Sequence, residues 1–207
     1  MKTFINVNSI MRLIVNILDR PIKVILIVLL IVSLIMLGGL IAEYFQRRYI
    51  TVKAASVIDA LKKAAKDPET IVKNSKLLAK QKRLLLELTI HNDLSNEMKE
   101  NFATSLLDNY FQNLEFTVKK SDLIVKLGPT FGLLGTLTPL GPGIIALAQG
   151  DTATLSLSLL AAFDTTVIGL VAASICTVIS MIRRRWYSKD KTMLTLIMEA
   201  VLEQETK

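Results

Sequence analysis

Residues 126–143, "KLGPTFGLLGTLTPLGPG", decide how this chain folds. The stretch is almost free of charge, yet it holds five glycines and three prolines where a simple membrane anchor would be rich in leucine. Small residues let membrane helices approach closely, because helices in lipid associate through packing rather than through the hydrophobic effect. The stretch therefore predicts a membrane helix with one thin face, built for close contact.

Two more long apolar stretches accompany this one, in a chain of 207 residues with 51% hydrophobic residues and a mean hydropathy of +0.46. The first covers residues 22–45, the stretch quoted above extends over 127–149, and the last covers 152–182 with Asp164 as its one charge. Each is long enough for the roughly 20 apolar residues that cross a bilayer. The sequence predicts an all-α membrane protein with three spanning helices.

The segments outside the spans complete the expected organisation. Residues 1–20 place apolar side chains at helical spacing, which is typical of a helix lying on a membrane surface. Residues 47–121 are glycine-free and helical in pattern, with Pro68 opening one helix and Ser95 capping another that runs on into the second span. The expected order is an amphipathic helix 1–20, a span 21–46, a cytoplasmic segment 47–121, spans 122–149 and 152–185, and a C-terminal helix 186–207.

Basic residues set the expected orientation. Arg47 and Arg48 follow the first span, lysines precede the second, and Arg183 to Arg185 end the third, whereas the link between spans two and three has no Lys or Arg. The positive-inside rule then places the middle segment and the C-terminus in the cytoplasm and the N-terminus outside, in a cytoplasmic (inner) membrane. The net charge of +7 needs no nucleic acid to explain it.

The sequence has no zinc-ligand spacing, Walker loop, dinucleotide-binding fingerprint or nucleophile motif. We therefore expect no enzymatic activity, no metal and no cofactor. The lone cysteine, Cys176, falls inside a span and is expected to pack as a small apolar residue. The lone histidine, His91, falls in a polar stretch and is expected to be solvated.

Small and hydroxylated residues recur on one side of both later spans. On the second span the steps of three and four give Gly128, Gly132, Thr136, Pro139 and Gly143. On the third span they give Ser158, Ala162, Thr166, Gly169, Ala173 and Thr177. Helix packing alone explains the glycines. The two threonines Thr136 and Thr166 fall near mid-membrane by their distance along each helix, where hydroxyls and proline-freed carbonyls could line a polar path.

Asp164 is the costly residue of the third span. A carboxylate at the centre of a bilayer opposes insertion by about 2.5–3.5 kcal/mol, so it marks a functional site by default. On an ideal helix it points about 200° away from Thr166. A protonated Asp164 bonded to a neighbouring helix is the structural alternative.

These motifs resemble the MotA/TolQ/ExbB proton channel family, and most closely its three-span ExbB and TolQ branch. The resemblance rests on "GPTFGLLGTLTPLG" at 128–141 and "LLAAFDTTVIGLVAA" at 159–173, together with the order of the spans and the helical insert. It implies a homopentamer whose second and third spans line a pore. A single-span partner of the ExbD/TolR/MotB type, with a membrane aspartate, would lie inside.

The resemblance also assigns roles to residues. It implies Thr136 and Thr166 as pore-lining threonines, Thr165 as a second threonine, and Pro129 as the pore-side proline. Where ExbB-like proteins carry a glutamate this chain has Ala161, and Asp164, one turn along, is a candidate for that role. The helix-packing and pore-lining positions are Gly128, Gly132, Gly135, Pro139, Ala162 and Gly169.

Three functions follow as hypotheses. The first is an ion-conducting subunit of an energy-transducing motor, or stator, that uses H⁺ or Na⁺. The second is a non-conducting membrane scaffold that uses the small faces only for assembly. The third is a channel that needs no partner, which has only one mid-membrane carboxylate per subunit to work with.

Overall fold

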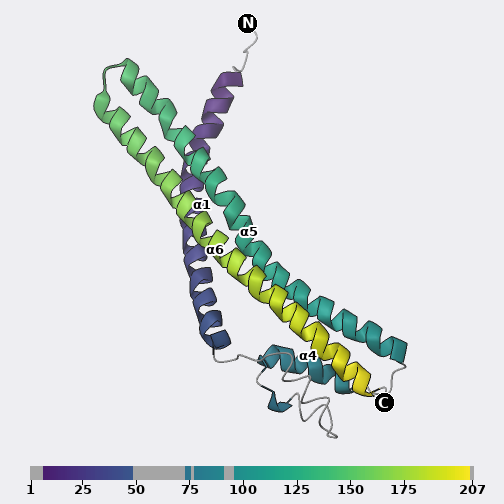
Figure 1. Cartoon of the computed structure of the whole chain (residues 1–207). Helices are drawn as coiled ribbons and strands as arrows, with labels where there is room; N and C mark the ends of the chain where they lie inside the picture. Colours follow the sequence, from purple (N-terminus) through teal and green to yellow (C-terminus); the bar gives the residue numbers. More distant parts are fainter. Residues whose placement is uncertain (1–6, 49–72, 76, 91–95, 206–207) are drawn as a thin grey trace. The chain divides into compact units, whose positions relative to one another are not determined.

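The computed structural model describes residues 7–48, 73–75, 77–90 and 96–205, and all its regular elements over that part of the chain are helices (Figure 1). These are α1 (Val7–Arg48), α4 (Ala79–Ile90), α5 (Asn96–Ala148) and α6 (Thr152–Glu205). Three of them, α1, α5 and α6, hold stretches long and apolar enough to cross a membrane. The all-helical, three-span prediction is confirmed to this extent.

Helix α1 runs without a break from Val7 to Arg48, with Pro21 inside it. A proline costs one backbone hydrogen bond and crowds the preceding turn, yet the apolar residues on both sides of Pro21 continue as one helix. Over residues 7–20 the expected surface helix is thus continuous with the first span. Residues 1–6 lie outside the described residues.

The two later spans also extend beyond the expected limits. Helix α5 enters its apolar stretch from Asn96 without interruption, and α6 continues past Arg185 to Glu205, so the expected C-terminal helix belongs to the same element. Of the expected helical insert, α4 is described, whereas residues 49–72, which include Pro68, and also His91 and Ser95 lie outside the described residues.

The chain divides into two compact units. Unit 1 comprises residues 1–39 and 119–180, and unit 2 comprises residues 40–118 and 181–207. Helices α5 and α6 contribute to both units. Each unit has its own apolar core.

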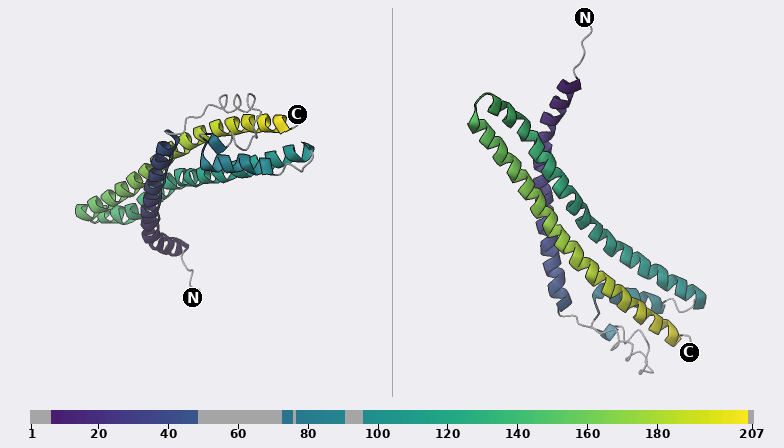
Figure 2. Two further views of the ribbon diagram at one scale, coloured as in Figure 1. Left: turned by 90° about the horizontal axis from the view of Figure 1, so that it is seen from below. Right: turned by 45° about the horizontal axis from the view of Figure 1, so that its top comes forward.

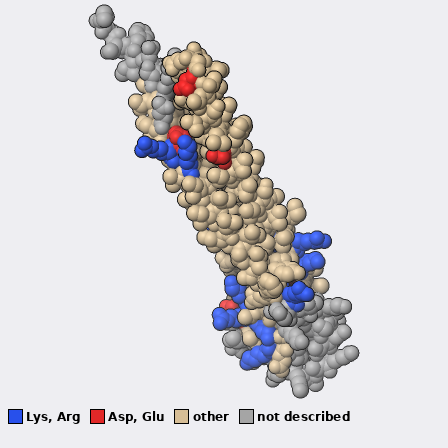
Figure 3. All heavy atoms as spheres, turned by 90° about the vertical axis from the view of Figure 1, so that its left-hand side faces the viewer, with Lys and Arg blue, Asp and Glu red and all other residues tan. Residues whose placement is uncertain are grey.

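The core of unit 1 is small. Ile124, Ala172 and Cys176 are buried, and the expectation that the cysteine packs as an apolar residue agrees with its complete burial. Leu29 and Leu30 of α1 pack against them. Many large apolar side chains of this unit are exposed, and the face drawn in Figure 3 is largely uncharged. Such a surface is suited to lipid or to other membrane helices.

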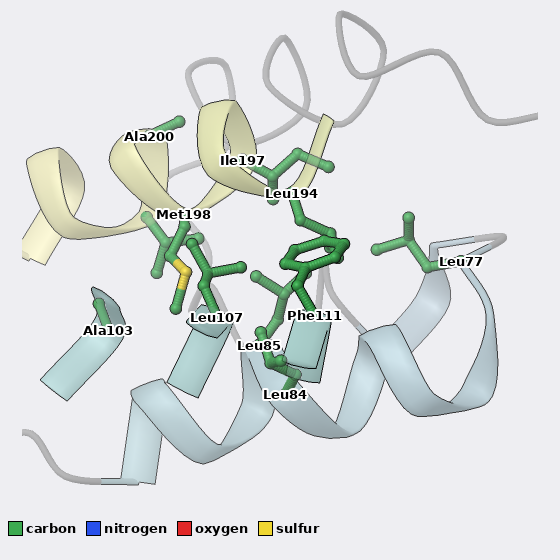
Figure 4. Close-up of a cluster of buried hydrophobic side chains, with 11 residues drawn as sticks. Leu77, Leu84, Leu85, Ala103, Leu107, Phe111, Leu194, Ile197, Met198 and Ala200 are labelled. Carbon is green, nitrogen blue, oxygen red and sulfur yellow. The ribbon is translucent and has the colours of Figure 1, made fainter. Parts of the chain in front are cut away.

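The core of unit 2 consists of large side chains from three helices. Leu84 and Leu85 of α4 meet Leu107 and Phe111 of α5 (Figure 4). From α6, the cluster receives Leu194, Ile197, Met198, Ala200 and Val201. Leu85, Leu194, Ile197 and Val201 are completely buried, so this unit is stabilised as a water-soluble helical bundle is, by removal of apolar surface from water.

Unit 2 also holds a partly buried ionic network. Arg47 donates two hydrogen bonds to the carboxylate of Asp190, at 3.2 and 2.8 Å, and a third to Glu43 at 3.1 Å. Arg183 lies 3.3 Å from the other oxygen of Glu43. The guanidinium of Arg47 lies 5.1 Å from the ring centre of Trp186, within the range of a cation–π contact. The network joins the end of α1 to the later part of α6.

A tight turn links α5 to α6. Gly150 adopts φ of 77°, a left-handed conformation that favours glycine after a helix end. Asp151 then caps α6: its carboxylate accepts hydrogen bonds from the Thr154 hydroxyl at 2.5 Å and from the Thr154 backbone N–H at 3.0 Å. These bonds, the hydroxyl first, hold the pKa of Asp151 below its ordinary value. The turn lets α5 and α6 run antiparallel beside each other (Figure 2).

Candidate ion path along α5 and α6

The contact between α5 and α6 in unit 1 is closest at Gly128 and Gly169, where backbone meets backbone. A methyl group on Gly128 would lie 2.5 Å from the carbonyl oxygen of Gly169 and 3.1 Å from the Cβ of Ala173. A methyl group on Gly169 would collide with the carbonyl oxygen of Gly128. We call this contact the α5–α6 seam; its glycines are Gly128, Gly132, Gly135, Gly143 and Gly169. The glycines permit a close approach of backbones that leucines would prevent.

The register of the seam brings the two threonine-bearing segments to one level. A methyl group on Gly135 would lie 2.7 Å from the Cβ and 2.9 Å from the Oγ1 of Thr165. One on Gly132 would lie 3.4 Å from the Thr165 carbonyl oxygen and 3.5 Å from the Cα of Thr166. Because α5 and α6 run antiparallel, Thr136 and Thr166 lie one residue to either side of the Gly135–Thr165 contact along the pair.

The threonine hydroxyls bond to their own helices. Thr136 donates to the carbonyl of Leu133 at 2.7 Å, and Thr165 donates to that of Ala162 at 2.8 Å. A threonine hydroxyl has one hydrogen and two lone pairs. Since the hydrogen of the accessible Thr136 is donated to the backbone, its oxygen keeps lone pairs that could accept a bond from a proton carrier or contact a cation.

Burial separates these residues into two groups. Thr165 is 5% exposed and lies within the seam, together with Ala162 at 4% and Thr138 at 7%. Thr136, Thr166 and Pro139 are half-buried at its margin, and Pro129 is exposed. Thr165 is therefore a packing residue in this single chain, whereas Thr136 and Thr166 remain accessible.

The prolines lie inside α5 and do not end it. Each lacks the N–H that would bond four residues back, which leaves the carbonyls of Val125 and Gly135 without their usual helical partners for Pro129 and Pro139. Freed carbonyls near the threonines add acceptors along the same stretch. The prolines thus increase the polarity of a helix that carries few polar side chains.

Asp164 points away from the seam. It is exposed, between Phe163 at 64% exposed and the buried Thr165, and Val167 one turn on is 58% exposed. The seam register places it at the level of Thr136 and Thr166. The structure thus brings Thr136, Thr165 and Thr166 together and leaves Asp164 on another side of α6.

A polar contact that sequence reasoning missed ends the seam on its lysine-rich side. Ser180 of α6 donates a hydrogen bond to the carboxylate of Asp122 of α5 at 2.5 Å. Ser121, beside it, is fully buried, and its hydroxyl has no hydrogen-bond partner in the described part of the chain. The signal was present, because Asp122 precedes Pro129 by seven residues and Thr136 by fourteen.

Three apolar helices of spanning length define a multi-pass membrane protein. Residues 71–196 match the MotA/TolQ/ExbB proton channel family over more than half of the chain. The chain therefore belongs to this family, as the two motifs predicted. Comparison with curated proteins gives no match.

Proposed function

We propose that this chain is the ion-conducting subunit of a motor complex driven by a proton- or sodium-motive force. It assembles as a homopentamer in a cytoplasmic membrane, with its N-terminus outside and its C-terminus in the cytoplasm. Ion flow through the pore moves a single-span partner of the ExbD/TolR/MotB type. The chain is not an enzyme and needs no cofactor beyond the transported ion. Membership of a proton channel family supports conduction itself.

The exposed Asp164 is the observation that carries the proposal. A carboxylate facing lipid at this depth is costly, and its exposed neighbours are apolar. The cost is removed if this side of α6 faces a water-filled pore, a partner or a second copy of the chain. Because Asp164 lies at the level of Thr136 and Thr166, a ring of subunits would gather carboxylates and hydroxyls in one layer.

The surface that the ring of subunits presents to the partner explains how the ring could move it. The hydroxyls of Thr136 and Thr166 at the margin of the seam, with backbone carbonyls freed by prolines, give a surface of weak polarity. On such a surface a partner carboxylate can change neighbours without being trapped by a strong charge pair. The driving force is modest, about 2.3 kcal/mol for each charge per 100 mV. Repeated ion passages are therefore needed for useful work.

The test is ion flux in liposomes. The chain is purified with a single-span partner of the ExbD/TolR/MotB type and reconstituted as wild type, Thr166→Val and Asp164→Asn. We expect flux that requires the partner and falls at least tenfold in both variants. Thr192→Val is the matched control, since this exposed threonine lies outside the spans and its hydroxyl bonds only its own helix, to Ser188, at 3.3 Å.

A non-conducting scaffold is the second candidate, and the seam favours it. Each of its glycines contacts the other helix of the same chain, so packing alone accounts for them. A scaffold predicts a stable oligomer that has no flux in any form and tolerates Thr136→Val and Asp164→Leu. Flux without any partner would instead indicate a self-sufficient channel and contradict the motor proposal.

A further inference from the structure

The Asp122–Ser180 contact lies on the same helix faces as the threonines. Seven residues on an α-helix fall only about 20° short of two full turns. Asp122, Pro129 and Thr136 follow one another at this spacing on α5, and Thr166, Ala173 and Ser180 do so on α6. The carboxylate–hydroxyl pair is thus in line with both threonines, about 21 Å along the helices from them.

Burial places the pair at the margin of the seam. Asp122 is half-buried, as are Thr136 and Thr166, whereas Ser180 is 6% exposed. The hydrogen bond from Ser180 fixes the carboxylate across the two helices. Along α5, lysines flank it at positions 119 and 126, three residues before and four residues after, which one helical face brings near.

The fully buried Ser121 gives a second, independent observation. A buried hydroxyl almost always has a partner, because leaving it without one costs the desolvation of the group. The Ser121 hydroxyl has none in the described part of the chain. Ser121 precedes Asp122 in the chain, and its buried hydroxyl has capacity to bond a water molecule near this end of the seam.

We propose that Asp122, oriented by Ser180, is the proton acceptor at the lysine-rich end of the path. A proton that has passed the level of Thr136 and Thr166 binds the Asp122 carboxylate, forms the neutral acid and then passes to bulk water, which restores the carboxylate. The orientation proposed above makes this the cytoplasmic exit. Asp122 is the group that exchanges the proton, and Ser180 is a positioning residue. This inference rests on the proposed function.

The test uses the reconstituted complex of the full chain with its single-span partner. Asp122→Asn keeps the shape of the side chain and an oxygen for the Ser180 hydrogen bond but removes the exchangeable proton. We expect assembly to be unchanged and proton flux to fall at least tenfold, with Asp122→Glu restoring most of it. Ser180→Ala should lower flux less than Asp122→Asn. Asp108→Asn, at an exposed position of α5, is the matched control and should conduct as wild type.

The outcomes separate this inference from the proposed function. If the wild-type complex does not conduct, the proposed function fails and the inference fails with it. If the wild type conducts and Asp122→Asn conducts equally, only the inference is overturned. If Asp122→Glu conducts as poorly as Asp122→Asn, the pair is a packing contact and the inference is again overturned. The same holds if Ser180→Ala prevents assembly of the complex.

Discussion

Helices α5 and α6 contact each other in both units of the molecule, but by opposite means. In unit 1 the contact consists of glycines and other small residues, and backbone meets backbone. In unit 2 the same two helices, joined by α4, bury leucines, isoleucine, phenylalanine and methionine. In lipid the apolar side chains gain nothing from leaving their solvent, so close packing must hold the helices. In water, removal of apolar area is the main stabilising term. The difference is what the proposed arrangement requires, with unit 1 in lipid and unit 2 in water.

Two natural reporters make the comparison measurable. Trp186, the single tryptophan of the chain, belongs to unit 2, and Cys176, the single cysteine, is fully buried in unit 1. Tryptophan fluorescence therefore follows unit 2, and the rate of thiol labelling follows the opening of unit 1. Substitution by alanine gives the sharpest contrast between the units. In the core of unit 2 an alanine is smaller than the leucine it replaces and leaves a cavity. In the α5–α6 seam an alanine is larger than the glycine it replaces and collides with the other helix.

The largest effect is expected from Leu194→Ala in unit 2. This side chain is completely buried in the core, and truncation leaves a cavity that costs about 2–5 kcal/mol of the free energy of unfolding. Denaturant unfolding followed by Trp186 fluorescence measures it. Leu196→Ala, on the same helix but 46% exposed, is the control. An equal loss in both variants would contradict the assigned core.

The next effect is expected from Asp190→Ala, which leaves Arg47 without its main partner. The two side chains are partly buried, at 19% and 12% exposed, so the loss should fall below the roughly 3–5 kcal/mol of a fully buried pair. The double variant Arg47→Met with Asp190→Leu should recover much of this stability, since no charge is then left unpaired. A double variant as unstable as the sum of the single ones would refute the pairing.

The sequence predicted the elements that depend on local composition. The sequence was enough to predict the three apolar stretches, the small-residue character of 128–143 and the family, because each follows from residues close in the chain. The contacts of Arg47 could not be predicted, since Asp190 lies 143 residues away. Nothing in the spacing of either residue points to the other.

The seam was predicted in part, and geometry explains the remainder. Steps of four from Gly128 reach Thr136, which has by then turned about 80° from the starting direction, whereas Gly135, seven residues on, has turned only about 20°. The structure accordingly places Gly135 in the seam and Thr136 at its margin. The same argument puts Thr165 inside the seam and Thr166 at its margin. Helical spacing in the sequence places Thr166 on the small face of the third span, whereas Thr165 is singled out only by the family resemblance.

Gly169→Ala tests the contact between α5 and α6 in unit 1, where glycines take the place of large apolar side chains. Its methyl group would collide with the Gly128 carbonyl, and backbone cannot move aside as a flexible side chain does. Overpacking of this kind costs about 1–3 kcal/mol. Labelling of Cys176 should then become about tenfold faster or more. Gly141→Ala is the control, because nothing lies within 4 Å of its added methyl group. Equal rates of Cys176 labelling in the two variants would contradict the close contact at Gly169.

The smallest effect is expected at the turn, where Asp151 caps α6 from a fully solvated position. Because the hydrogen bonds from Thr154 lower the pKa of Asp151 in the folded state, the carboxylate stabilises the fold above its unfolded pKa. That stability is lost as the pH falls through the folded pKa, below the ordinary 3.8. Asp151→Ala should therefore melt at a slightly lower temperature than wild type at pH 7, and the two melting temperatures should converge under acid. Asp151→Asn, which still caps, should show little of this pH dependence. A difference that persists in acid would mean that the turn is held by its backbone bonds and the left-handed Gly150 rather than by the charge.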